Sequence, residues 1–101
     1  MSFGNLQKMA MQMQRDMARV EEELREARLE GSAGGGVVRA VVTGKQELVE
    51  LAIDPDAVDP ADVEMLQDLV VAAVNDALKS SRALGEAKMA AVTGGMRLPG
   101  M

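Results

Sequence analysis

Apolar residues recur along the first third of the chain with alternating spacings of four and three, and this pattern constrains the fold more than any other. They are Leu6, Ala10, Met13, Met17, Val20, Leu24 and Ala27. The spacing is that of a coiled-coil seam, so residues 5–29 are predicted to form one amphipathic helix. At a rise of about 1.5 Å per residue the helix is on the order of 37 Å long, too long to be covered by so small a chain. The helix is therefore expected to need a partner.

The middle of the chain has the composition of a small antiparallel sheet. Residues 37–43 are apolar or β-branched at nearly every position, and residues 47–53 alternate, with Val49, Leu51 and Ile53 on one face. The four residues from Thr43 to Gln46 are predicted to form the loop of a hairpin. Residues 28–30 are a candidate edge strand, and the glycine-rich residues 31–36 are interpreted as a connection.

A second long helix is predicted over residues 60–89. Asp59 is the expected N-cap and Pro60 the first helical residue, because aspartate and proline favour these positions. Residues 69–74 are apolar around most of the helix circumference, so one side is expected to take the sheet and the other a second subunit. Residues 1–92 are thus predicted to form one domain, and residues 93–101 a flexible C-terminal tail.

Missing residue types exclude most catalytic and metal chemistry. The chain has no histidine and no cysteine, which removes the commonest general base, thiol nucleophiles and thiolate metal sites. Ser80 and Ser81 therefore lack a recognisable activating group. We predict no enzymatic activity, no catalytic residue, no cofactor and no bound metal.

Three patterns resemble ligand sites, but each has a simpler structural explanation. The glycine run precedes a strand and not a helix, so a turn is favoured over a phosphate-binding loop. The acidic segment 54–64 is interrupted by two prolines and lacks the mid-loop glycine and the closing glutamate of a calcium loop, so its carboxylates are expected to cap turns and helices. Methionine thioethers could bind monovalent copper, but packing at a helix interface is favoured for Met9, Met11, Met13 and Met17.

Positive charge collects at the two ends of the chain. Residues 1–19 have a net charge of +2, residues 77–101 have +3, and the residues between them have −10, which gives the overall −5. On spacing alone, these cations are more typical of a solvated helix face than of a nucleic-acid site. An acidic body with basic extremities can still contact phosphate locally.

The order of motifs resembles the YbaB/EbfC family of bacterial nucleoid-associated proteins over almost the whole chain. The similarity comprises the Met- and Gln-rich segment 6–14, the glycine-rich turn, the strand and Asp-Pro at 49–55, the helix segments 64–70 and 72–77, and the glycines and proline of 94–100. The resemblance implies an α+β protomer of order α-β-β-β-α that forms a tweezer-like homodimer. It also implies binding to double-stranded DNA with little or relaxed sequence preference.

Expected site residues follow from this resemblance. The DNA-binding cations in the matching helices are Lys8, Arg15, Arg19, Lys79, Arg82 and Lys88. The expected dimer interface comprises Met13, Met17, Val20, Val70, Val71 and Val74. Arg39 and Lys45, in or beside the central strands, are expected to matter far less. We expect a cytoplasmic location on the nucleoid, with no membrane or small-molecule partner. Two alternatives remain open: a protein-interaction adaptor that uses the Met-rich helix, and an amphipathic helix on a lipid surface.

Overall fold

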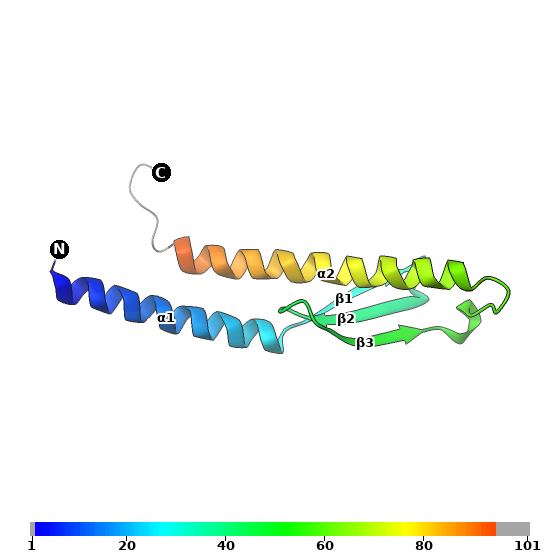
Figure 1. The fold of residues 1–101 in the computed structure, drawn as a ribbon, viewed down its shortest axis with the longest axis horizontal. Coiled ribbons are helices and arrows are strands. Elements are labelled where there is room, and N and C mark those ends of the chain that lie inside the picture. Colours follow the sequence, from blue (N-terminus) through cyan, green and yellow to red (C-terminus); the bar gives the residue numbers. More distant parts are fainter. Residues whose placement is uncertain (1, 95–101) are drawn as a thin grey trace.

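The computed structural model describes residues 2–94 and confirms the α+β class with the order α-β-β-β-α. The elements are α1 (Phe3–Glu26), β1 (Arg28–Ala33), β2 (Val38–Thr43), β3 (Leu48–Ile53) and α2 (Val63–Gly94), with single 3-10 turns at Gly34–Gly36 and Pro55–Ala57. The molecule is long and narrow, 70 × 27 × 16 Å. Figure 1 shows that the sheet and the first half of α2 form a body, from which α1 and the second half of α2 extend side by side as two arms.

The sheet is an antiparallel meander with β2 in the centre. Ala40 of β2 lies opposite Gly31 on β1 and Leu51 on β3. A bulge between Val41 and Val42 shifts the register, so that Leu48 pairs with Val42. Cross-strand partners share a face of a sheet, so Leu48 and Leu51 of β3 point to the same side as the core residues of β2.

The predicted edge strand is confirmed as β1, but it is longer than residues 28–30. It continues through Gly31, which the sequence pattern assigned to the connection. A β-carbon at Gly31 would lie 2.2 Å from the backbone nitrogen of Ala77 and 2.5 Å from the carbonyl oxygen of Ala73. Glycine is present here because α2 lies directly on the backbone of β1. The turn proper is Gly34–Gly36, where φ values of 64°, 72° and 98° favour glycine.

The first helix ends earlier than predicted. Ser2 is its N-cap, and its side-chain oxygen accepts a hydrogen bond from the backbone N–H of Asn5. The helix stops at Glu26 because Ala27 is extended and Leu29 pairs with Val42 in the sheet. The helical periodicity of the sequence continued to residue 29, but pairing with β2 determines the boundary.

The second helix starts later and ends later than predicted. Asp62, and not Asp59, caps it: the Oδ1 atom of Asp62 accepts a hydrogen bond from the N–H of Met65 at 3.1 Å. Asp59 instead accepts from the N–H of Ala61 at 2.9 Å, within the preceding turn. At the other end α2 includes Thr93 and Gly94, two residues assigned by the sequence to the tail. The remaining tail residues, 95–101, lie outside the described part of the chain.

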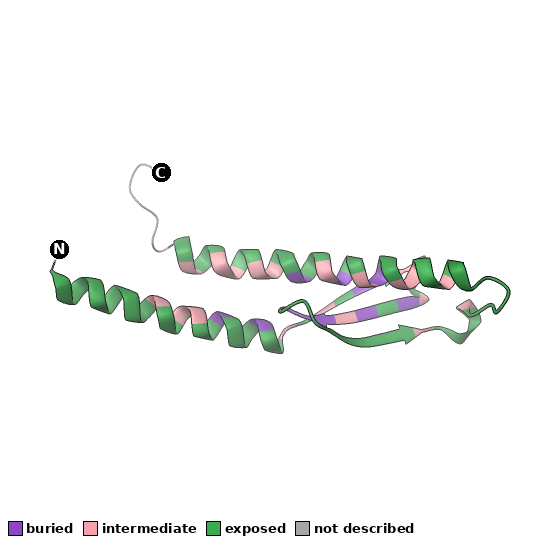
Figure 2. Cartoon of the chain, in the orientation of Figure 1, coloured by how far each residue is buried: buried purple, intermediate pink, exposed green. Residues whose placement is uncertain are grey.

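The core is a thin layer between α2 and the two strands that it covers. Val38, Ala40, Val42, Ala73 and Ala77 are completely buried (Figure 2). Because Ala73 and Ala77 are small, α2 can lie close to the backbone of β1 at Gly31. By contrast, Leu48 and Leu51 of β3 are 49% and 39% exposed because α2 does not extend over that strand. None of the helices within residues 2–94 is long and apolar enough to cross a membrane.

Candidate nucleic-acid interface

The two arms pack through the apolar seam of α1. Val20 and Leu24 are buried, with 4% and 7% of their surface exposed. Val20 lines a small gap together with Ala91 and Val92 of α2. The apolar seam of α1 is therefore covered in part by α2 of the same chain. Met13 and Met17 are half-buried, whereas Leu6, nearer the arm tip, is 51% exposed.

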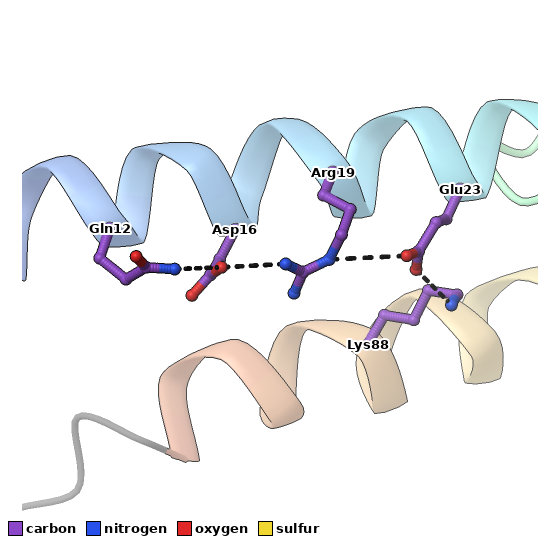
Figure 3. Close-up of polar contacts among 5 residues, drawn as sticks. All are labelled: Gln12, Asp16, Arg19, Glu23 and Lys88. Carbon is purple, nitrogen blue, oxygen red and sulfur yellow. Dashed lines mark hydrogen bonds and ion pairs between the residues drawn. The ribbon is translucent and has the colours of Figure 1, made fainter.

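A chain of polar contacts runs along α1 and crosses to α2 (Figure 3). The Nε2 atom of Gln12 donates to Asp16 at 2.9 Å, and Arg19 forms ion pairs with Asp16 at 3.1 Å and with Glu23 at 3.6 Å. The Nζ atom of Lys88, on α2, lies 2.7 Å from the second carboxylate oxygen of Glu23. Glu23 thus holds one cation from each arm.

The charge of Glu23 is stabilised by these neighbours. The hydrogen bond from Lys88 lowers the pKa of the Glu23 carboxyl below its ordinary 4.5, and the charges of Lys88 and Arg19 act in the same direction. Because the carboxylate is exposed to solvent, the contribution of each ion pair to folding is modest. The carboxylate also neutralises two cations that were expected to contact DNA.

The other four expected cations are distributed over both arms. Lys8 and Arg15 lie on the exposed surface of α1, where Arg15 donates to the side-chain oxygen of Gln12 at 3.0 Å. Lys79 and Arg82 are exposed on α2. Within residues 2–94, none of these four forms an ion pair. No carboxylate of the described chain thus pairs with these four cations, whereas Arg19 and Lys88 are both engaged by Glu23.

Negative charge lies at the opposite end of the molecule from the arm tips. The connection between β3 and α2, at the far end of the body in Figure 1, contains Asp54, Asp56, Asp59 and Asp62, all exposed. Asp54 and Asp62 cap the 3-10 turn and α2, respectively. Within the described residues no group of three or more carboxylates is placed to hold a metal ion. This acidic connection thus lies far from the exposed cations of the arms, although the arms also carry carboxylates, which are Asp16, Glu21, Glu22, Glu23, Glu26 and Glu86.

Lys45 is the cation whose position the sequence did not predict. Its side chain lies beside α1, with Nζ 3.6 Å from the Oε1 atom of Glu21. The turn between β2 and β3 reaches to the base of the arms, and Lys45 lines the same cleft as Arg82 of α2. In the sequence Lys45 lies next to the central strands, and only the direction of the hairpin places it near the arms.

Comparison with known proteins identifies the family. Residues 1–96 match the sequence model of the YbaB/EbfC DNA-binding family. The chain belongs to this family. Similar proteins include a nucleoid-associated protein of Moorella thermoacetica, 55% identical with 99% of both chains covered. A nucleoid-associated protein of Acetivibrio thermocellus is 50% identical, with 99% of this chain and 89% of the relative covered.

A solved structure agrees with the fold. The crystal structure of a Helicobacter pylori protein superposes with a TM-score of 0.74 at 27% sequence identity, covering 96% of this chain and 99% of that one. The YbaB/EbfC family is a non-enzymatic DNA-binding family, so its members supply no catalytic residues to look for in this chain.

Proposed function

We propose that this YbaB/EbfC protein is a homodimer that binds double-stranded DNA with little sequence preference, through phosphate contacts from its arms. The observation that carries the proposal is the position of four exposed cations relative to the acidic connection between β3 and α2. Exposed Lys8, Arg15, Lys79 and Arg82 lie on the two arm helices, and the acidic loops lie at the opposite end of the body. A DNA polyanion attracts the arms and repels the body, so the protein approaches DNA with its arms first.

Contacts of this kind position a protein without reading bases. The only aromatic residue of the chain is Phe3, so a stacking platform of several rings is not available. Cations that contact phosphates release counterions and give affinities that fall steeply with salt. The name of the relatives, nucleoid-associated protein, supports a location on the chromosome in the cytoplasm. Nucleoid organisation, gene expression and DNA repair are the processes that such binding can serve.

Dimerisation is supported by the apolar face that one chain leaves uncovered. Leu48 and Leu51 of β3 point to the side on which α2 lies, but α2 covers β1 and β2 only. The Oδ2 atom of Asp76 on α2 accepts a hydrogen bond from the N–H of Ser32 on β1, so that flank of the helix faces β1. Val74 lies on the other flank and therefore faces the β3 side. Val71, beside it, is 58% exposed. A second copy that covers this strip would bury it and place two pairs of arms in a tweezer-like arrangement.

A salt series of DNA-binding measurements tests the proposal. If each protomer brings two or three cations to DNA, the logarithm of the association constant should fall against the logarithm of salt concentration with a slope of about −4 to −5. Arg15→Glu and Arg82→Glu should weaken binding to unrelated sequences in parallel. Each should also flatten the slope by about one unit for every phosphate that the variant no longer neutralises.

Arg39→Glu is the matched control because Arg39 is an exposed arginine on β2, away from the arms, and lies 4.0 Å from Glu30. Its salt slope should equal that of the wild type. If Arg39→Glu abolishes binding while both arm variants bind normally, the DNA surface lies on the sheet and the arm proposal is wrong.

One observation favours a second candidate function, that of a protein-interaction adaptor. Leu6, Met9 and Met11 of α1 are all exposed, and an apolar arm tip is suited to another protein. Competition with unlabelled random-sequence DNA separates the two functions. An adaptor would show no binding to DNA at low salt, whereas the proposed DNA-binding protein is displaced by any duplex in excess.

A further inference from the structure

An open cleft of about 470 Å³ lies at the base of the arms. One wall is the turn between β2 and β3, with Lys45 and Gln46, and the other is α2, with Arg82, Gly85 and Glu86. Leu24, at the end of α1, forms part of the floor. Figure 1 shows this turn reaching to the end of α1, at the point where the arms leave the sheet.

Gly85 is the residue in this cleft that most needs an explanation. It lies in the interior of α2, where glycine is less favourable than alanine. Two other glycines of the fold are required by packing, since a β-carbon at Gly31 or Gly44 would collide with neighbouring backbone. A β-carbon at Gly85 would meet nothing within 4 Å. No contact within the described chain accounts for this glycine, but its effect is to keep the wall of the cleft open and the helix backbone accessible.

Cations from two different elements line the two walls of the cleft. Arg82, one turn before Gly85 on α2, is exposed and forms no ion pair within residues 2–94. Lys45 comes from the hairpin turn, and the one ion pair that it forms within residues 2–94 is with Glu21, 3.6 Å away on the exposed surface of α1. The turn that presents Lys45 contains Gln46 at a φ of 63°, a conformation that is uncommon for residues other than glycine. Glu86 is the one carboxylate in the lining, and it opposes an anion.

We propose that this cleft seats a segment of the DNA sugar–phosphate backbone, with Arg82 and Lys45 contacting phosphates from either side and Gly85 admitting the strand close to α2. The inference rests on the proposed DNA-binding function and extends the contact surface from the arms to their base. It reverses the sequence-based expectation for Lys45. It also predicts that the negative charge of Glu86 weakens DNA binding at the cleft.

Replacing Gly85 tests the shape of the cleft. Gly85→Leu fills the opening, and Gly85→Ala adds a single methyl group; both remove a helix glycine, so both should melt at the wild-type temperature or above. Gly85→Leu should bind DNA about tenfold more weakly at 0.1 M salt, and Gly85→Ala should stay within about twofold of the wild type. A packing role for Gly85 predicts the opposite pair of results, lower stability with unchanged affinity.

Charge variants test the cleft without changing its shape. Lys45→Gln should weaken binding about three- to tenfold and flatten the salt slope by about one unit. Glu86→Gln should strengthen binding, and Arg39→Gln is the neutral control. In the Gly85→Leu background, Lys45→Gln should have little further effect on DNA affinity, because the DNA backbone no longer reaches the cleft.

Three results would overturn the inference. Wild-type affinity in a folded Gly85→Leu variant is the first, and unchanged affinity in both Lys45→Gln and Glu86→Gln is the second. The third is a Gly85→Leu variant whose mass in light scattering is half that of the wild type, which would make the cleft an interface between copies of the chain. If the wild type itself does not bind DNA at low salt, the proposed function has failed instead, so the two failures are distinguishable.

Discussion

The Nζ atom of Lys88 lies 2.7 Å from a carboxylate oxygen of Glu23, and this ion pair joins the two arms. The Arg19 guanidinium approaches the other oxygen of the same carboxylate at 3.6 Å. One acidic side chain therefore restrains the arms and also occupies two cations of the expected DNA surface.

The contribution of Glu23 to stability should depend on pH. Because its pKa is lowered in the folded protein, the stabilisation is complete above the ordinary value of 4.5 and is lost as the pH falls through the lowered value. The difference in unfolding free energy between the wild type and Glu23→Gln should be largest near neutral pH and shrink below pH 4.5. Urea unfolding at a series of pH values measures it. Glu50→Gln, on exposed β3, is the control, and a Glu23→Gln difference that is constant down to pH 3 would contradict the prediction.

Removal of the same carboxylate should strengthen DNA binding. Glu23→Gln frees Lys88 and Arg19 to contact phosphate, so affinity at 0.1 M salt should rise about three- to tenfold and the salt slope should steepen. Titration of labelled duplex at several salt concentrations measures both quantities. Weaker binding by Glu23→Gln would mean that the ion pair positions the arms for DNA and does not compete with it.

Gly31→Ala should be strongly destabilising. The added methyl group would lie 2.2 Å from the backbone nitrogen of Ala77, so α2 would have to move off the sheet. We expect a loss of about 3 kcal/mol or more in unfolding free energy, measured by urea denaturation. Gly4→Ala is the control, because nothing lies within 4 Å of that position, and it should leave stability unchanged or raise it by up to about 1 kcal/mol, since alanine is favoured over glycine in a helix. Equal effects of the two changes would show that α2 does not lie against β1.

The start of α2 should depend on Asp62 more than on Asp59. Asp62→Ala removes the hydrogen bond to the N–H of Met65 and should cost about 1 kcal/mol. Asp59→Ala removes a turn contact to Ala61 and should cost clearly less. Thermal melts of both variants in the same buffer give the comparison. The reverse order would restore the helix start that the sequence alone predicts.

Leu51→Glu should separate the homodimer without unfolding the protomer. Leu51 is 39% exposed on the strip of β3 that α2 leaves open, so a charge there is tolerated by one chain but not by an apolar interface. The mass measured by light scattering should fall from about twice the chain mass of 10.7 kDa to that of a single chain. Ala52→Glu, the adjacent residue on the opposite face beside Arg39, should remain dimeric. A wild-type protein that is already monomeric at micromolar concentration would remove the basis of the prediction.

The sequence predicted those parts of the fold that depend on local periodicity. The seam of α1 and the hairpin of β2 and β3 each leave a repeating pattern in the chain, and both are present. Gly31 was misassigned because its role depends on contact with Ala77, far along the chain, and a glycine in a strand looks like a glycine in a loop. The start of α2 was misplaced because Asp59 and Asp62 are both good caps, and only the path of the preceding turn distinguishes them.

The site was predictable only as a set of charges. The family model describes a DNA-binding family, and the sequence indicated which cations are on the helices. It could not indicate that Arg19 and Lys88 share Glu23, since that pairing depends on the rotation of one helix against the other. Nor could it bring Lys45 to Arg82, because the direction of a hairpin relative to a distant helix has no local signal.

The continuity of α2 has a mechanical consequence. Its first half is fixed on the sheet by the buried alanines and Gly31, and its second half is an arm without a break between them. Residues 79–94 span about 24 Å, so a tilt of about 5° where the helix crosses the sheet would displace the arm tip by about 2 Å. The helix therefore moves as one rigid rod about its closely packed crossing with β1, and small changes of angle at that crossing determine the separation of the arms.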